Sequence, residues 1–184
     1  MKKTDKRVLI VLIVVVVIAV GILIAVNRQP ASYSLSAEIG EATPETLWRD
    51  AEAVVLAEPT GHVSRFTAGS VRFRLVEVKL TGTVRGALTA EQTVQILQTE
   101  GLKADISLKK GRRCLLFLDA YVPGTAEGME RAEGSYTVKG AFKGVYELDA
   151  DGNLTAVRTP YETEEQTATR EAAMREIWDS ISRG

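Results

Sequence analysis

Residues 8–26 form an uninterrupted apolar run. None of these 19 side chains is polar, and Gly21 is the one residue among them that is not aliphatic. A helix of this length spans about 28 Å, close to the roughly 30 Å hydrocarbon core of a bilayer. Because backbone polar groups inside lipid must be satisfied within the segment, the pattern predicts a transmembrane helix.

Basic residues predict the orientation of this helix. Four of them lie within residues 2–7, whereas Arg28 alone closely follows the apolar run. The positive-inside bias places residues 1–7 in the cytoplasm and the rest of the chain outside it, on a single-pass protein of the cell membrane. A cleaved signal peptide is the alternative, but its apolar region is normally shorter and followed by a small-x-small site. Length and flanking residues therefore favour a retained signal anchor.

A short stalk and a helix are predicted next. Residues 27–42 are small and polar, which is typical of a linker. Thr43 and Pro44 then suit the cap and first position of a helix whose buried stripe is Leu47, Trp48 and Ala51. We expect residues 43–184 to form the extracytoplasmic domain.

The middle of the domain alternates as strands do. Residues 53–57 are apolar and end at Pro59 and Gly61, and residues 71–79 alternate with Arg72 and Arg74 on one face. The apolar phase switches near Leu75, which predicts a bulge or bend in that strand. Residues 81–86 form a predicted turn, residues 93–98 a further strand, and residues 113–118 a strand buried on both faces.

Later segments predict a hairpin and a helix. After a loop over residues 123–134 and a short strand over 136–138, the strand-like segments 144–148 and 154–157 flank the turn 149–153. A capping box then opens a helix over residues 163–182. Its buried stripe consists of Ala173, Met174, Ile177, Trp178 and Ile181, and its opposite face of Arg170, Glu171, Arg175, Glu176 and Asp179.

These elements predict an α+β domain that is mainly β. We expect a small Greek-key, OB-like antiparallel barrel with a short N-terminal helix and a longer C-terminal helix, behind the transmembrane helix. The 184 residues hold 23 basic and 24 acidic side chains, and removing the five bases and one acid of residues 1–28 leaves a net charge of −5. Such a domain is not expected to bind nucleic acid.

Few residues could carry chemistry. The single Cys and single His exclude a disulfide framework and a Cys-rich zinc module. Cys114 lies in an apolar run and is predicted to be buried and inert. His62 is the only possible base for nucleophilic hydrolysis, and the chain has no Gly-x-Ser-x-Gly elbow. The turn at Asp149 lacks the glycine and glutamate positions of a calcium loop. We therefore expect no enzyme activity, no metal and no cofactor.

Basic side chains are the remaining candidate site. Arg72 and Arg74 share one strand face, and Lys109 and Lys110 cluster before another strand. One interpretation is a solvated sheet face, which is common on any soluble domain. The other is a patch that binds an acidic envelope polymer or protein.

Four stretches carry a resemblance: AEAVVLAEPTG, VRFRLVEVKLTGTVRG, LKKGRRCLLFLDAYV and GAFKGVYELDADGNL. Together they resemble a pattern in uncharacterised membrane-anchored or secreted bacterial proteins, and are similar in outline to the OB-fold-like, netrin-type barrel of metalloproteinase-inhibitor domains. The resemblance spans residues 52–157 and rests on strand order and glycine placement. That family ligates a protease zinc through a cysteine at its mature N-terminus. No cysteine stands at a comparable place here, so inhibition is not implied.

Three functions follow as hypotheses. The first is a non-catalytic binding or scaffolding module, anchored in the bilayer through residues 8–26, that binds an envelope protein or polymer. The second is a cell-envelope hydrolase or a regulator of one, which a deep pocket holding His62 beside carboxylates would favour. The third is a subunit of a membrane complex that uses Gly21 for helix contacts.

Overall fold

The computed structural model describes residues 42–102, 106, 108–124 and 127–182. The predicted cytoplasmic tail, the transmembrane helix over residues 8–26 and nearly all of the predicted stalk lie outside these residues. Within the described part of the chain, no helix combines the length and the apolar character needed to cross a bilayer. The fold described below belongs to the compact unit formed by residues 39–184.

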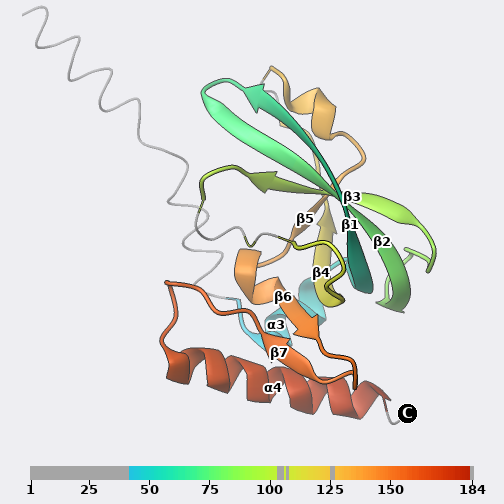
Figure 1. The fold of residues 1–184 in the computed structure, drawn as a ribbon, viewed down its shortest axis with the longest axis vertical. Coiled ribbons are helices and arrows are strands. Elements are labelled where there is room, and N and C mark those ends of the chain that lie inside the picture. The colour runs from blue at the N-terminus through green and yellow to red at the C-terminus, as the bar shows by residue number, and fades with distance from the viewer. Residues whose placement is uncertain (1–41, 103–105, 107, 125–126, 183–184) are drawn as a thin grey trace, which may run out of the picture. The chain divides into compact units, whose positions relative to one another are not determined.

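The described residues form a mixed α+β domain that is mainly sheet, as the sequence predicted (Figure 1). Two α-helices and two 3₁₀ turns accompany the sheet: α3 (Pro44–Asp50), α4 (Glu164–Ser182), η1 (Met129–Ala132) and η2 (Ala141–Gly144). The strands are β1 (Ala53–Ala68), β2 (Val71–Arg85), β3 (Thr93–Thr99), β4 (Cys114–Ala120), β5 (Tyr136–Val138), β6 (Val145–Leu148) and β7 (Leu154–Ala156).

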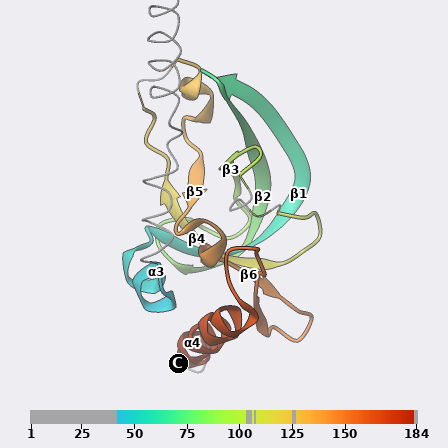
Figure 2. The same ribbon diagram turned by 90° about the vertical axis from the view of Figure 1, so that its left-hand side faces the viewer.

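Strand pairing partly closes the sheet into a barrel-like body. β1 pairs with β2 along its length and also with β4 over residues 53–57, and β2 pairs with β3. β3 meets β5 in parallel at one residue pair, Ile96 and Tyr136, and β5 pairs antiparallel with β4. The pairings therefore run β1-β2-β3-β5-β4 and return to β1, while β6 and β7 extend the sheet beyond β4. Figure 2 shows the long β1–β2 hairpin curving around this body.

Three apolar clusters stabilise the domain. The inner cluster fills the space enclosed by β1–β5, the helix cluster lies between the sheet and the helices α3 and α4, and the hairpin cluster lies at the far end of β1, β2 and β3. β4 belongs to two of them, because Leu116 and Leu118 face the inner cluster while Leu115 and Phe117 face the helix cluster. The prediction that this strand is buried on both faces is confirmed.

The bulge predicted as one alternative for residues 71–79 is not found in β2, which pairs with β3 without a register shift from Phe73 to Lys79. The register shifts of the β1–β2 pairing lie in β1 between Pro59 and Val63, and in β2 between Leu80 and Gly82 and between Thr83 and Arg85. The apolar phase of β2 changes for another reason: Leu75 packs in the hairpin cluster, whereas Val76 packs in the inner cluster on the opposite face. Each half of the strand is covered by a different layer.

Two strands are longer than predicted. β1 passes through Pro59 and Gly61, where the bulge and the positive φ of Gly61 (+91°) accommodate the chain, and it ends at a two-residue turn. Gly69 begins this turn with a φ of +57°, the conformation of a tight hairpin. The predicted turn over residues 81–86 is strand as far as Arg85. Turn-forming residue types were therefore outweighed by long cross-strand pairing.

The predicted loop 123–134 contains a short 3₁₀ turn, η1, whose Met129 is buried.

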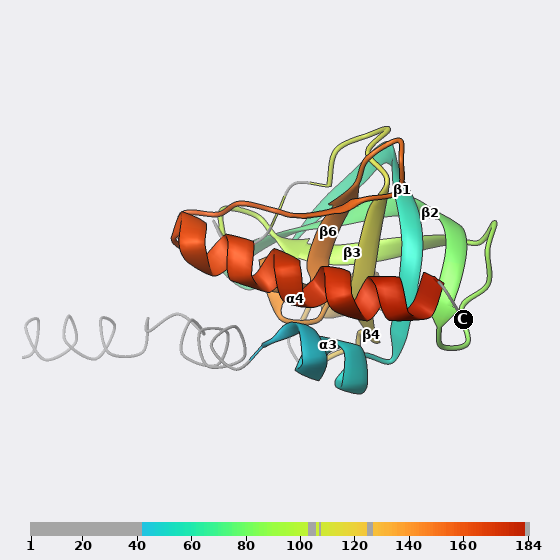
Figure 3. The same ribbon diagram turned by 90° about the horizontal axis from the view of Figure 1, so that it is seen from below.

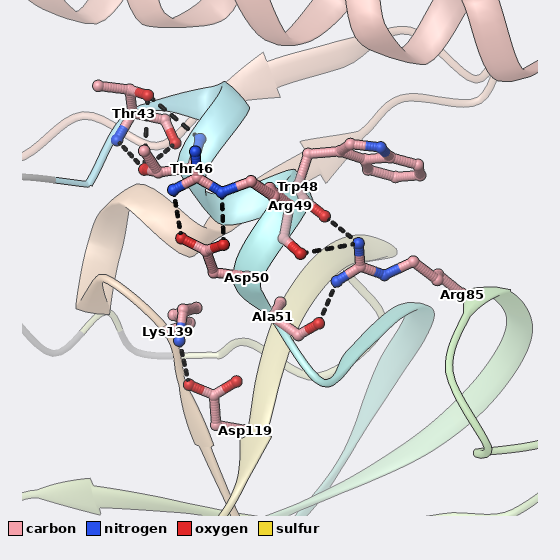
Figure 4. A network of polar contacts seen from close by, with 9 residues as sticks. All are labelled: Thr43, Thr46, Trp48, Arg49, Asp50, Ala51, Arg85, Asp119 and Lys139. Carbon is pink, nitrogen blue, oxygen red and sulfur yellow. Dashed lines mark hydrogen bonds and ion pairs between the residues drawn. The ribbon is translucent and has the colours of Figure 1, made fainter.

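Helix α3 begins as predicted and is held at its end by a distant strand. Thr43 and Thr46 form a reciprocal capping box around Pro44. At the other end, the Arg85 guanidinium donates to the backbone oxygens of Trp48, Arg49 and Ala51, which places a cation on the negative end of the helix dipole (Figure 4). Arg85 also lies 5.6 Å from the centre of the Trp48 ring. Trp48, expected as a core anchor, is half-buried at this contact.

Helix α4 begins after the predicted capping box, in which Thr163 and Gln166 exchange hydrogen bonds. The helix lies across β6 and β7 with α3 beside it (Figure 3). One residue was predicted on the wrong face: Arg170 is only 5% exposed and pairs with Glu162 at 2.7 Å. Its charge is tolerated inside because Glu162 and the Val157 carbonyl accept from it.

Side chains of α4 also cover the outer edge of β7. Glu171 accepts a hydrogen bond from the Ala156 amide at 2.8 Å, and Arg175 donates to the Leu154 carbonyl at 3.1 Å. Both backbone groups face away from β6, so without α4 they would stand at an unpaired strand edge. We call residues 154–156 with their α4 partners the covered edge.

Candidate functional site

The far half of the β1–β2 hairpin carries three arginines on one face. Arg65 lies directly across from Arg74, and Thr67 lies across from Arg72. Alternate residues of a strand share a face, so Arg72 and Arg74 stand on the same side, as predicted, and Arg65 joins them from the neighbouring strand. The opposite side carries Phe73 and Leu75, which pack in the hairpin cluster. We call Arg65, Arg72 and Arg74 the arginine face.

Glu100, just beyond β3, ties two of these arginines together. Its carboxylate lies 2.7 Å from Arg65 Nε and 3.9 Å from Arg72 Nε, and its amide donates to the Arg72 carbonyl. The Arg65 and Arg72 side chains are 63% and 75% exposed, whereas that of Glu100 is 20% exposed. Glu100 therefore fixes the direction of two exposed guanidiniums while neutralising one charge of the three.

Gln98 positions the third arginine. Its side-chain oxygen accepts from Arg74 Nε at 3.0 Å, and its amide nitrogen donates to the Ile106 carbonyl at 2.8 Å. Gln98 is buried, and its amide is held at both ends, so Arg74 meets a fixed acceptor. None of the three arginines forms a hydrogen bond through its Nη atoms to a residue that the structure describes. Those paired donors have the geometry that binds carboxylates in a bidentate manner.

The predicted lysines belong to another region. Lys109 and Lys110 are exposed in the connection between β3 and β4. The Lys110 stem packs against Gly61 in the β1 bulge, so closely that a Cβ on Gly61 would lie 2.9 Å from it. No contact between described residues joins either lysine to the arginine face. Of the four predicted residues, the structure groups Arg72 with Arg74 and leaves the lysines apart.

His62 lies in the β1 bulge and is highly exposed. Its Nδ1 is 3.2 Å from a carboxylate oxygen of Glu77, to which Thr60 also donates at 2.7 Å, and its side chain is 83% exposed. An open bulge of this kind differs from the deep pocket that would favour a hydrolase. Among the described residues, no group of three or more His, Cys, Asp or Glu is placed to hold a metal ion.

Cys114 is buried in the inner cluster, as predicted. Its thiol donates to the Ala57 carbonyl at 3.3 Å. Burial raises the pKa of Cys114 to about 12, with smaller contributions from the charges of Glu147 and Glu58. The reactive thiolate is therefore scarce at neutral pH, and the residue acts as a small packing group.

Two positioning residues were missed from the sequence. Gln98 and Glu100 differ by two positions in β3 and its continuation, which places them on one face. Nothing in the alternation of β3 alone says that this face adjoins Arg72 and Arg74. The signal that finds them is the register between β2 and β3, which pairs Arg74 with Gln98.

No protein-family model matches the chain, and no curated protein matches it. These searches give no indication of an enzyme.

Proposed function

We propose that this protein is a non-catalytic binding or scaffolding module, anchored in the cell membrane through residues 8–26 with its folded domain outside the cytoplasm. The arginine face contacts an acidic protein or polymer of the cell envelope. One observation carries the proposal: three guanidiniums share one exposed sheet face with a single carboxylate, and two buried or half-buried side chains hold them in place.

We further propose that the barrel-like body is of the OB type, which supports this function. The five strands β1–β5 form a small, partly open circuit in which one pairing is parallel and the rest are antiparallel. Barrels of that type bind extended polymers and other ligands on the face of their second and third strands and on nearby loops. Arg72, Arg74, Gln98 and Glu100 belong to those strands or follow directly on them.

The charge distribution supports an acidic partner. Residues 29–184 have a net charge of −5, so the arginine face is a local exception on an acidic body. The net negative charge repels an anionic ligand from acidic parts of the domain and the arginine face attracts it, which orients the encounter. Arginine also binds carboxylates through two parallel hydrogen bonds, which lysine cannot do.

Labelled poly-L-glutamate tests the proposal, with the full-length protein in a non-ionic detergent and fluorescence anisotropy as the measurement. Reversing two charges in Arg72→Glu/Arg74→Glu removes two bidentate donors and adds two repelling carboxylates. We expect affinity for poly-L-glutamate to fall by about tenfold or more at low salt. Thermal unfolding of the variant shows whether the domain still folds.

Lys109→Glu/Lys110→Glu is the matched control, because it makes the same change in net charge elsewhere on the domain. Its affinity should fall by about threefold or less, through the long-range field alone. Equal losses in the two variants would mean that net charge, and not the arginine face, decides binding. Unchanged binding by both variants would overturn the proposal.

A further inference from the structure

β1 has an edge that no described strand covers. On one side it pairs with β2 as far as Ala68, but on the other side its pairing with β4 stops at Ala57. Beyond Ala57, β2 is the only described strand that pairs with β1. Residues 61–65 and 67 are exposed along it, and Val63 is 37% exposed although it is apolar.

Hairpin geometry shows which backbone groups face this edge. Ala68 and Val71 flank the two-residue turn and form a hydrogen-bonded pair, and such pairs alternate with non-hydrogen-bonded ones along an antiparallel ladder. Thr67, Arg65 and Val63 fall on the non-hydrogen-bonded positions. Their amides and carbonyls therefore point away from β2, toward the uncovered side.

Two contacts agree with this assignment. Arg72 lies across from Thr67, and its carbonyl accepts from Glu100 on the β3 side, so this pair does not bond across the hairpin. On the other side, Gly128 lies against the Thr67 carbonyl, where a Cβ would stand 3.0 Å from the oxygen. Gly128 therefore covers the Thr67 carbonyl. Residues 63–65, which we call the open edge, form no hydrogen bond with described residues through the outward amides and carbonyls of Val63 and Arg65.

We propose that the open edge docks an extended acidic peptide segment as an added antiparallel strand. This inference rests on the proposed function, since the same arginines supply the charge, and it names the class of partner. Unpaired amides and carbonyls at a strand edge are a template for a further strand, and the side chains beside them determine which strand is accepted.

Charge identifies the occupant. A residue placed opposite Arg65 points to the same face as Arg65, Arg74 and Arg72, so carboxylates at alternate positions of the added strand meet guanidiniums. A second copy of this chain is disfavoured, because pairing about Arg65 brings two Arg65 and two Arg74 side chains onto one face.

The first test uses the acetylated and amidated peptide Ser-Val-Glu-Val-Glu-Val-Ser with the full-length protein in detergent. In the proposed pairing the glutamate amides face β1 and the central valine amide faces away. Methylating the two glutamate amide nitrogens should weaken binding by about tenfold or more, because two hydrogen bonds are lost. Methylating the central valine amide should change it by about twofold or less. Equal effects of the two methylations would overturn the proposal.

The second test acts on the protein. Val63→Pro removes one outward amide and keeps every arginine, and proline is tolerated where a strand amide faces solvent. Peptide affinity should fall by about fivefold or more, while poly-L-glutamate affinity stays within about twofold. Val63→Ala keeps the amide and is the control. If Val63→Pro does not fold, the methylated peptides decide the question alone.

Amide hydrogen exchange locates the added strand. On peptide binding, exchange at Arg65 should slow by about tenfold or more, whereas Phe66, already bonded to β2, should change little. Binding of poly-L-glutamate without these peptide effects would leave the proposed function standing and overturn the added strand. If poly-L-glutamate does not bind and the peptide effects are also absent, both the proposed function and the added strand are overturned. Peptide binding that anionic phosphatidylglycerol vesicles abolish, or a dimer formed through the open edge, would assign the edge to lipid or to a second copy and overturn the proposal.

Discussion

The two edges of this sheet differ in how their backbone groups are satisfied. At the covered edge, Ala156 and Leu154 receive their hydrogen bonds from Glu171 and Arg175 of α4. At the open edge, the outward groups of Val63 and Arg65 have no such partner among the described residues. Side chains of α4 thus satisfy the backbone at the covered edge, whereas the open edge is flanked by exposed charged side chains. Exposed charge discourages indiscriminate pairing but leaves room for a complementary strand.

The first prediction removes the ion pair between Arg170 and Glu162, which holds α4 against the sheet. Arg170→Ala leaves Glu162, whose side chain is 8% exposed, as an unpaired buried charge beneath α4. We expect the free energy of unfolding to fall by about 3–5 kcal/mol, measured by denaturant unfolding with tryptophan fluorescence. Arg158→Ala is the control, because Arg158 and Glu164 are both exposed and their pair should contribute nothing measurable. A loss below about 1 kcal/mol for Arg170→Ala would contradict the assigned role.

The second prediction uncovers the covered edge. Glu171→Ala removes the acceptor of the Ala156 amide and should lower the free energy of unfolding by about 1–2 kcal/mol. Amide exchange at Ala156 should quicken by about tenfold, toward the behaviour expected at Arg65 in the free protein. Glu171→Gln keeps an acceptor oxygen and should restore much of the protection. Slow exchange at Ala156 in Glu171→Ala would show that α4 does not supply the cover.

The third prediction concerns Tyr146 in the helix cluster beneath α4, and it has the smallest effect on stability at neutral pH. The Tyr146 hydroxyl is buried beside the Arg170 guanidinium, and no hydrogen bond of normal geometry reaches it from the described residues. Tyr146→Phe should therefore change the free energy of unfolding by less than about 1 kcal/mol at pH 7, or raise it. A larger loss would show that the hydroxyl is bonded.

Alkaline pH sharpens this prediction. Burial raises the pKa of Tyr146 from 10.0 to about 12, the largest of several influences, with the Arg170 charge acting in the opposite direction. Below pH 10 the Tyr146 hydroxyl is neutral in both the folded and the unfolded protein. Above pH 10 the hydroxyl ionises in the unfolded protein first, so the free energy of unfolding falls as the pH rises from about 10 to 12. Tyr146→Phe should lose less stability than the parent across this range, by about 1 kcal/mol for each pH unit. Cys114, present in both proteins, adds an equal decline to each.

Local patterns predicted the elements whose cause is local. The caps at Thr43 and Thr163, the hairpin around Asp149 and the burial of β4 all depend on residues close in the chain, and all are confirmed. The alternation of Arg72 and Arg74 likewise predicted their shared face. These features follow from backbone period and capping chemistry, which a single sequence contains.

Features that depend on register could not be predicted in this way. Arg65 joins the arginine face only because β1 pairs with β2 at Arg74, and Gln98 only because β3 pairs there as well. Arg170 was assigned to solvent because its charge suits the polar side of α4, but Glu162 precedes the helix and pairs with it inside. A charge becomes tolerable in a core through a partner, and helical period does not reveal the partner.

The placement of α3 and α4 has a consequence for how the domain is presented. Both helices pack on the helix cluster, so the first and last described elements lie together, while the tip of the β1–β2 hairpin lies at the opposite end (Figures 1 and 2). A partner bound at the hairpin tip therefore leaves the first and the last described elements of the domain uncovered.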